Sequence, residues 1–213
     1  MRVSTFFFLI VPIAIYSQGF VKDTDGFVNV RDTYDFKISK VIDTFHNNHL
    51  VWINDQLGNW YEVWSIKNKD RSGYIHKSRI LDINEKDNFN RKKINENKLL
   101  LFTDRIKIFV ERKKFERVEI DTKNSYDTDG NLPRFEYKNI TIDFQNKKYM
   151  LTNEDYLKHL YESNVNDMSV CYNGNDNLLY ISSLNSDGAG AYAVVWIINN
   201  DTDKIERITT IPF

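Results

Sequence analysis

The sequence predicts a mainly β protein, with a small barrel followed by a β-rich domain that contains one short helix. Three observations support this prediction. Aromatic residues make up 14% of the 213-residue chain, and aromatic and β-branched side chains favour strands. Apolar and polar residues alternate over short runs, which is the pattern of half-buried strands. Turn pairs such as Asp25-Gly26 separate these runs at short intervals.

Residues 1–17 are predicted to be a signal peptide rather than part of the fold. Arg2 precedes an apolar run from Phe6 to Ile15, and small or polar residues follow at Ser17 and Gln18. The run is shorter than the ~20 residues that a spanning helix needs, although an N-terminal membrane anchor is the alternative. We therefore expect cleavage before Gln18, export to the periplasm or the medium, and no membrane span after cleavage.

Residues 20–82 are predicted to form the barrel. Strand-like runs lie at 27–31, 40–45, 49–55, 60–66 and 72–80, with turn signals between them. In the first run, Phe27, Asn29 and Arg31 share one face, while Val28 and Val30 share the other. Five short strands in such a short segment are typical of a small barrel.

Residues 83–98 are almost all charged or amide-bearing, so we expect a polar linker here, with a solvated helix as the alternative. Residues 99–213 are predicted to be the β-rich C-terminal domain. Its expected strands are 105–111, 115–120, 135–144, 147–152, 168–173, 177–184, 191–199 and 204–211.

The one helix is expected at 152–164. Thr152 or Asn153 can cap it, and acidic residues follow in what would be its first turn. Its apolar face would consist of Tyr156, Leu157, Leu160 and Tyr161.

Charge and chemistry exclude several classes of function. The formal net charge of −1 gives no global basic field for nucleic acid. Cys171 is the only cysteine, so it cannot form an intramolecular disulfide and is expected to be a small buried residue. His46 and His49 lack an evident third metal ligand, and no hydrolase or metalloprotease motif is present. We therefore expect no cofactor, no metal and no catalytic activity.

Three motifs in residues 20–82 resemble those of the bacterial SH3 (SH3b) family. These are Asn29-Val30-Arg31, then Gly58 with Trp60 and Val63, and finally the run Gly73-Tyr74-Ile75-His76. Their order matches the family, but residues 35–50, where the family often has Gly, Pro and Ser, contain no Gly or Pro and a single Ser. The resemblance implies a small barrel that binds cell-wall peptide or another extended ligand.

A barrel of this size has no interior cavity, so its ligand must lie on its surface. Aromatic rings would provide the contact area, and polar side chains would bind peptide amides. For Trp60 and Tyr74, core packing is an equally good interpretation. The expected ligand-binding residues are Asn29, Asp32, Tyr34, Trp52, Trp60, Tyr61 and Tyr74.

A second candidate site is Asp129 with Asp187, Gly188 and Gly190. The run S-D-G-A-G-A-Y at 186–192 resembles a segment of small exported bacterial proteins of uncharacterised function. Two structural turns are the alternative, because Asp-Gly pairs favour turns. The spacing of Asp127, Asp129 and Asn131 lacks the glycine and glutamate positions of a calcium loop, so we interpret it as a turn as well.

The sequence thus favours an exported, non-catalytic binding protein whose barrel recognises cell-wall peptide or a protein partner. One alternative is an inhibitor or immunity protein that blocks a secreted toxin or wall hydrolase. A second alternative is an enzyme with a site near Asp129 and Asp187, which would require a concave acidic pocket.

Overall fold

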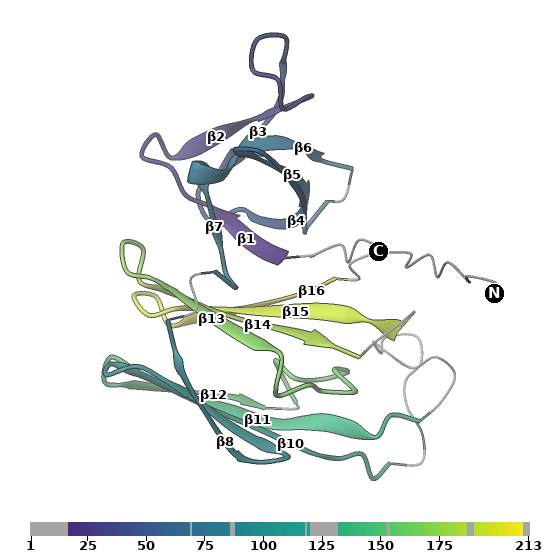
Figure 1. The fold of residues 1–213 in the computed structure, drawn as a ribbon. Coiled ribbons are helices and arrows are strands. Elements are labelled where there is room, and N and C mark those ends of the chain that lie inside the picture. The colour runs from purple at the N-terminus through teal and green to yellow at the C-terminus, as the bar shows by residue number, and fades with distance from the viewer. Residues whose placement is uncertain are drawn as a thin grey trace, which may run out of the picture.

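The computed structural model describes residues 17–68, 70–85, 88–117, 119, 132–152, 154–186 and 190–210. The chain is mainly β, as predicted, and consists of three antiparallel sheets of seven, five and four strands (Figure 1). No helix in these ranges is both long and apolar enough to cross a membrane.

The seven-stranded sheet contains the N-terminal strands in the order β3-β2-β6-β5-β4-β1-β7 and curls around its own apolar core (Figure 1). The burial of β2 alternates as predicted, because Val28 and Val30 are buried while Phe27 and Asn29 are exposed. The strands are β1 (Ser17–Val21), β2 (Phe27–Arg31), β3 (Val41–His46), β4 (Leu50–Leu57), β5 (Trp60–Ser65), β6 (Ser72–His76) and β7 (Ile80–Asp82). A short 3₁₀ helix, η1 (Lys77–Arg79), joins β6 to β7.

The first strand begins before residue 20, where the barrel was expected to start. All five residues of β1 are buried. The Ser17 hydroxyl donates to Asp82 Oδ1 at 2.5 Å, which ties the start of β1 to the end of β7. Cleavage before Gln18 stays a prediction.

The other two sheets pack face to face as a sandwich around a shared apolar core. The five-stranded sheet has the order β12-β11-β10-β9-β8, and the four-stranded sheet runs β13-β14-β15-β16. The strands are β8 (Asn90–Asn95), β9 (Lys98–Phe102), β10 (Ile106–Lys114), β11 (Phe135–Phe144), β12 (Lys147–Thr152), β13 (Met168–Asn173), β14 (Leu178–Asn185), β15 (Tyr192–Asn199) and β16 (Lys204–Thr210).

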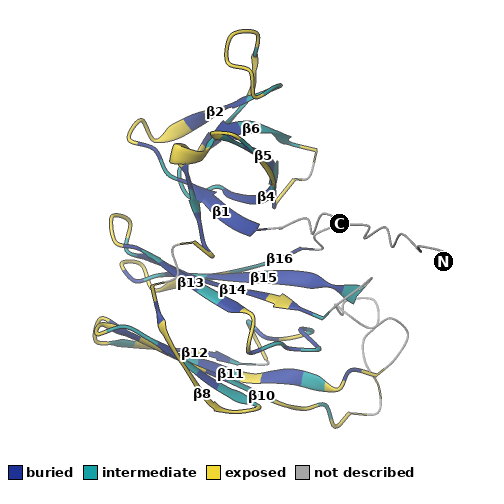
Figure 2. Cartoon of the chain, in the orientation of Figure 1, coloured by how far each residue is buried: buried dark blue, intermediate teal, exposed yellow. Residues whose placement is uncertain are grey.

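The four-stranded sheet is the middle of three layers (Figures 1 and 2). Leu179 and Ile181 point into the sandwich core, while Tyr180 points to the other side. There a second core joins the sheet to the barrel through Phe20 and Trp52. Because β14 and β15 are buried on both faces, they contain nearly continuous apolar runs instead of alternating ones.

The predicted linker at 83–98 is wrong for most of its length. Ile83 and Phe89 are buried, and residues 90–95 form β8, a fully exposed edge strand that pairs with β9. Its charged sequence follows from this position, since basic side chains on an edge strand discourage pairing with other sheets.

The predicted helix at 152–164 is also wrong. After β12 ends at Thr152, the described part of this segment consists of turns and an isolated bridge between Tyr161 and Glu136. His159 (φ 64°) and Glu162 (φ 46°) adopt left-handed backbone that no α-helix contains. Leu157 and Leu160 are still buried in the sandwich core. The apolar spacing therefore reflected burial of one side of the segment, which turns can also achieve. The strand expected at 115–120 is absent from its described residues, because β10 ends at Lys114.

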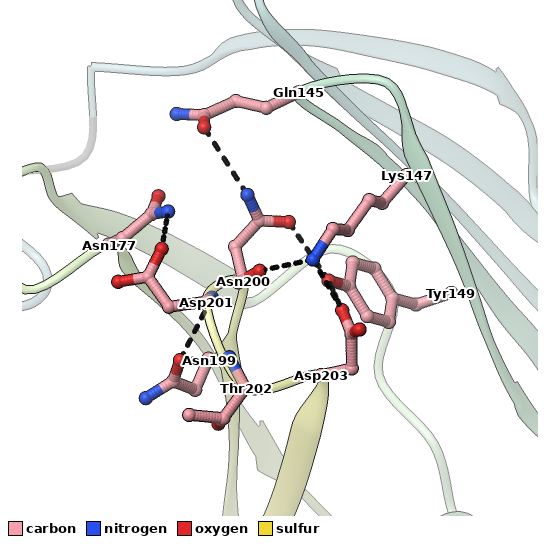
Figure 3. Close-up of polar contacts among 9 residues, drawn as sticks. All are labelled: Gln145, Lys147, Tyr149, Asn177, Asn199, Asn200, Asp201, Thr202 and Asp203. Carbon is pink, nitrogen blue, oxygen red and sulfur yellow. Dashed lines mark hydrogen bonds and ion pairs between the residues drawn. The ribbon is translucent and has the colours of Figure 1, made fainter.

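Polar contacts hold the two sheets of the sandwich together at one end (Figure 3). Lys147 Nζ on β12 donates to Asn200 O (2.6 Å) and pairs with Asp203 Oδ1 (2.8 Å) in the turn before β16. The Tyr149 hydroxyl lies 2.9 Å from both Asp203 Oδ1 and Asn200 Oδ1 and donates to one of them. Burial and the bond to Asp203 raise the pKa of Tyr149 to about 12. This turn thus has a structural role.

Candidate functional site

A groove opens on the outer surface of the barrel between β2 and β6. Within the described residues these two strands pair at Arg31 and Tyr74 alone, and then they diverge. The pairing depends on Gly73, because a Cβ there would lie 2.5 Å from Arg31 O. The close approach of β2 therefore explains why the G-Y-I-H motif begins with glycine. Beyond this pair, the divergence of the two strands leaves a groove of about 670 Å³.

One wall of the groove is an unpaired strand edge. Gly26 O accepts from Asn47 N (2.9 Å), and Asp32 N donates to Lys40 O (3.1 Å). The even-numbered residues at both ends of β2 therefore turn their backbone groups toward β3. Backbone groups of alternate residues point to opposite edges of a strand. Those of Phe27 and Asn29 therefore face the groove, where an extended peptide could pair with them.

The side chains around the groove combine apolar surface with hydrogen-bond donors. Trp60 on β5 stands beside His76 on β6, with ring centroids 5.5 Å apart and planes nearly perpendicular. On the β2 side lie Phe27, Asn29 and Arg31, and buried Val28 and Ile75 also contribute to the lining. The indole N–H of Trp60 has no hydrogen-bond partner among the described residues.

Arg31 is positioned by the loop between β2 and β3. Its Nη1 donates to Ser39 Oγ (3.0 Å), and its guanidinium lies 4.6 Å from the centroid of the Phe36 ring. A guanidinium has five N–H donors, so donors other than Nη1 are left for a ligand. The same loop exposes 66% of Phe36 and places further apolar side chains, Tyr34 and Ile38, in solvent beside the groove.

The seven residues predicted from the sequence separate into four groups, of which three lie on the surface of the barrel. Asn29 and Trp60 lie together in the groove. Tyr34 and Tyr74 contact each other edge to face at 5.9 Å, outside the groove lining. Asp32 accepts from Lys40 N (2.8 Å) and so closes the loop.

Two of the predicted ligand residues are in the core instead. Trp52 is 3% exposed and packs between the barrel and the four-stranded sheet. Tyr61 is 7% exposed and belongs to the core of the barrel. The prediction for these two is wrong for different reasons. Tyr61 points into the barrel, whereas Trp52 alternates with the barrel-core residues Val51 and Ile53 and so lies on the outer face, which the four-stranded sheet covers.

Sequence reasoning assigned no ligand role to Phe27, Arg31, Phe36, His76 and Arg79, all of which line the groove. A signal for two of them was present, since Phe27 and Arg31 share the outward face of β2 with Asn29. Phe36 and Arg79 reach the groove through the course of a loop and of η1, which period-two alternation does not describe.

The second candidate site lies almost entirely outside the described residues, which include Gly190 but not Asp129, Asp187 or Gly188. On β14, Asn185 is fully buried, and its Oδ1 accepts from the Tyr137 hydroxyl (2.7 Å) and from Asn164 N (2.9 Å). Cys171 is buried.

The histidines at 46 and 49 line a cleft of about 360 Å³ between the barrel and the four-stranded sheet. His49 Nε2 lies 2.9 Å from Ser65 Oγ, and its ring stacks on Phe45 at 4.2 Å. In the described part of the chain, no three His, Cys, Asp or Glu side chains are grouped to hold a metal ion. His49 therefore has ordinary packing contacts, and His46 is exposed at the end of β3.

Comparisons of the chain with protein-family models, curated proteins and solved structures gave no match. The resemblance to the SH3b family thus depends on the three motifs themselves. These motifs lie on β2, β6 and at the start of β5, which are neighbours in the sheet. The groove runs along this set of strands.

Proposed function

We propose that this chain is an exported, non-catalytic binding protein whose SH3b-like barrel holds a short extended peptide of the bacterial cell wall in the β2–β6 groove. The signal-peptide pattern of residues 1–17 supports export, and the three barrel motifs support the family assignment. The observation that carries the proposal is the groove itself, in which an unpaired strand edge lies beside an accessible tryptophan.

The chemistry of the groove suits such a peptide. The backbone groups of Phe27 and Asn29 would pair with the amides of an extended chain. Trp60 would cover an aliphatic side chain, and Asn29 would bind a further amide. Wall peptides carry free carboxylates, and a guanidinium such as that of Arg31 binds carboxylates with two parallel hydrogen bonds.

The proposal predicts that the full chain is retained by purified peptidoglycan sacculi and that Trp60→Ala weakens retention by at least about tenfold. A buried aromatic anchor commonly accounts for much of the binding energy at such a site. Co-sedimentation over a concentration series measures the effect, after circular dichroism has shown that each variant is folded.

Phe109→Ala is the matched control, since it truncates an exposed aromatic residue far from the barrel and should leave retention unchanged. Wild-type protein that stays in solution would contradict the wall-peptide proposal and direct the search to a protein ligand for the groove. Equal retention of wild type and Trp60→Ala would move any wall-binding site away from the groove.

A further inference from the structure

Positive charge is concentrated in one sheet of this nearly neutral protein. Strands β8 to β12 contain eleven lysines and arginines but three acidic residues, a net charge of +8. The whole chain has a formal net charge of −1, so the remaining residues together carry −9. The charge is therefore strongly asymmetric between the layers of the molecule.

The outer face of the five-stranded sheet is an open layer on the side away from the barrel (Figure 1). Ile108, Val110 and Ile142 point into the sandwich core, so the residues that alternate with them point outward. The inter-strand register aligns four outward residues, Met150, Thr141, Phe109 and Leu100, in one row across β12, β11, β10 and β9.

This row presents apolar residues to solvent at its β12 end and on the central strand β10. The side chain of Met150 is 64% exposed and that of Phe109 is 41% exposed. The register continues the row to Lys92 on β8, and Lys107 lies one row away, opposite Phe102. An apolar centre with a charged rim is the arrangement of a protein–protein interface.

Two of the cations on this face lie outside its ion pairs. Glu111 already binds Lys138 (2.9 Å) and Lys98 (3.3 Å), and Asp143 lies 3.8 Å from Lys148. Within the described residues, Lys92 and Lys107 make no ion pair. Lys92 ends the apolar row on β8, and Lys107 lies one row away, opposite Asp143 on β11. Both lysines therefore present positive charge close to the apolar residues.

Protection of sheet edges does not explain the whole pattern. Basic residues on the edge strands β8 and β12 discourage edge-to-edge pairing. Lys107 and Phe109, however, lie on β10, the central strand of the sheet. An exposed phenylalanine beside a lysine in the middle of a sheet face has no such protective role.

We propose that the outer face of β8–β12 is a docking surface for an acidic protein, which places an apolar side chain on Phe109 and Met150 and its carboxylates near Lys92 and Lys107. Glu111 and Asp143 lie within the same face and would repel a uniform polyanion such as nucleic acid. This surface is separate from the barrel groove, so the protein would bind a wall peptide at one end and an acidic protein at the other.

The test uses the full chain with a labelled random copolymer of glutamate and tyrosine as the probe, followed by fluorescence anisotropy at low salt. We expect saturable binding that Lys92→Gln/Lys107→Gln weakens by about fivefold, because two exposed charge pairs are lost. Phe109→Ser should weaken it as well. Lys37→Gln/Lys40→Gln removes the same charge from the exposed barrel loop and should have no effect.

Several results would overturn the proposal. These are no binding of the copolymer, equal weakening by the control pair, and tighter binding of duplex DNA or of phosphatidylglycerol vesicles than of the copolymer. Trp60→Ala, which tests the groove, should bind the copolymer as the wild type does. Failure of the docking surface and failure of the wall-peptide proposal are therefore distinguishable.

Discussion

At the scale of single residues, the same residue type has different roles that depend on the strand face. Trp52 and Trp60 lie on neighbouring strands, yet Trp52 is buried between two layers while Trp60 lines a groove. Gly73 has a role that no larger residue could take, because β2 approaches it within contact distance. His49 is held against Phe45 and Ser65 at the inner end of a turn.

The environment of His49 predicts a pH-dependent stability. Burial, with smaller contributions from nearby Arg71 and Lys67, lowers the pKa of His49 below its ordinary value of 6.5. As the pH falls through 6.5, the unfolded chain takes up a proton before the folded one does, so folding stability is lost. Thermal melting should show a decrease in Tm from pH 7 to pH 5 that is smaller in His49→Gln. An equal decrease in both proteins would contradict this assignment.

Asp43 is a second residue whose pKa shift predicts how stability depends on pH. The two hydrogen bonds from Arg71, both at 2.7 Å, lower the pKa of the Asp43 carboxyl below 3.8. The stabilisation is fully present above pH 3.8 and is lost as the pH falls through the folded-state pKa. The difference in Tm between wild type and Asp43→Asn should therefore be constant from pH 5 to 8 and shrink below pH 3.8. A difference in Tm that is as large at pH 2 as at pH 7 would contradict this role of the Asp43–Arg71 pair.

At the scale of elements, strands were predictable where one face is buried and the other is exposed to solvent. Val28 and Val30 alternate with Phe27 and Asn29, and the strand, its inner face and part of the groove followed from that pattern. Elements in other environments were harder to identify. The buried turns at Leu157 and Leu160 have the apolar spacing of a helix. Strand β8 has the polar composition of a linker, because a paired edge strand needs no apolar face.

The hairpin between β11 and β12 gives a test at this scale. Gln145 (φ 48°) and Asn146 (φ 68°) both adopt left-handed backbone, as a two-residue hairpin turn requires. Asn146→Ala should lower the free energy of unfolding by about 1 kcal/mol, while Asn146→Gly should not lower it. Urea denaturation followed by circular dichroism measures both values. Equal stability of the alanine and glycine variants would contradict the turn geometry.

At the scale of the whole molecule, the barrel and the sandwich form one folded unit. The sequence could not reveal this, because an interface residue such as Trp52 has the same pattern as a ligand-binding aromatic. The layer between them includes Phe20 and Trp52 from the barrel and Tyr180 and Val195 from the sheet. Gln18 on β1 also accepts a hydrogen bond from Ser182 on β14 across the layer.

This shared layer predicts cooperative unfolding. Calorimetry of the wild type should show one transition, because neither part can unfold without exposing the apolar surface of the other. Trp52→Ala should lower the free energy of unfolding by about 3–5 kcal/mol and reduce the temperature of that single transition. Two separate transitions in the wild type would show that the barrel and the sandwich fold independently.

The position of the groove can be tested with the tryptophan indole N–H signals in a ¹⁵N–¹H correlation spectrum. The chain has four tryptophans. Trp52 and Trp196 are buried, Trp64 packs against the layer below the barrel, and Trp60 alone lines the groove. On titration with a soluble wall stem peptide, the Trp60 signal should shift in a saturable manner while the other three stay in place. An unchanged Trp60 signal at saturating peptide would contradict the proposal that the groove binds the wall.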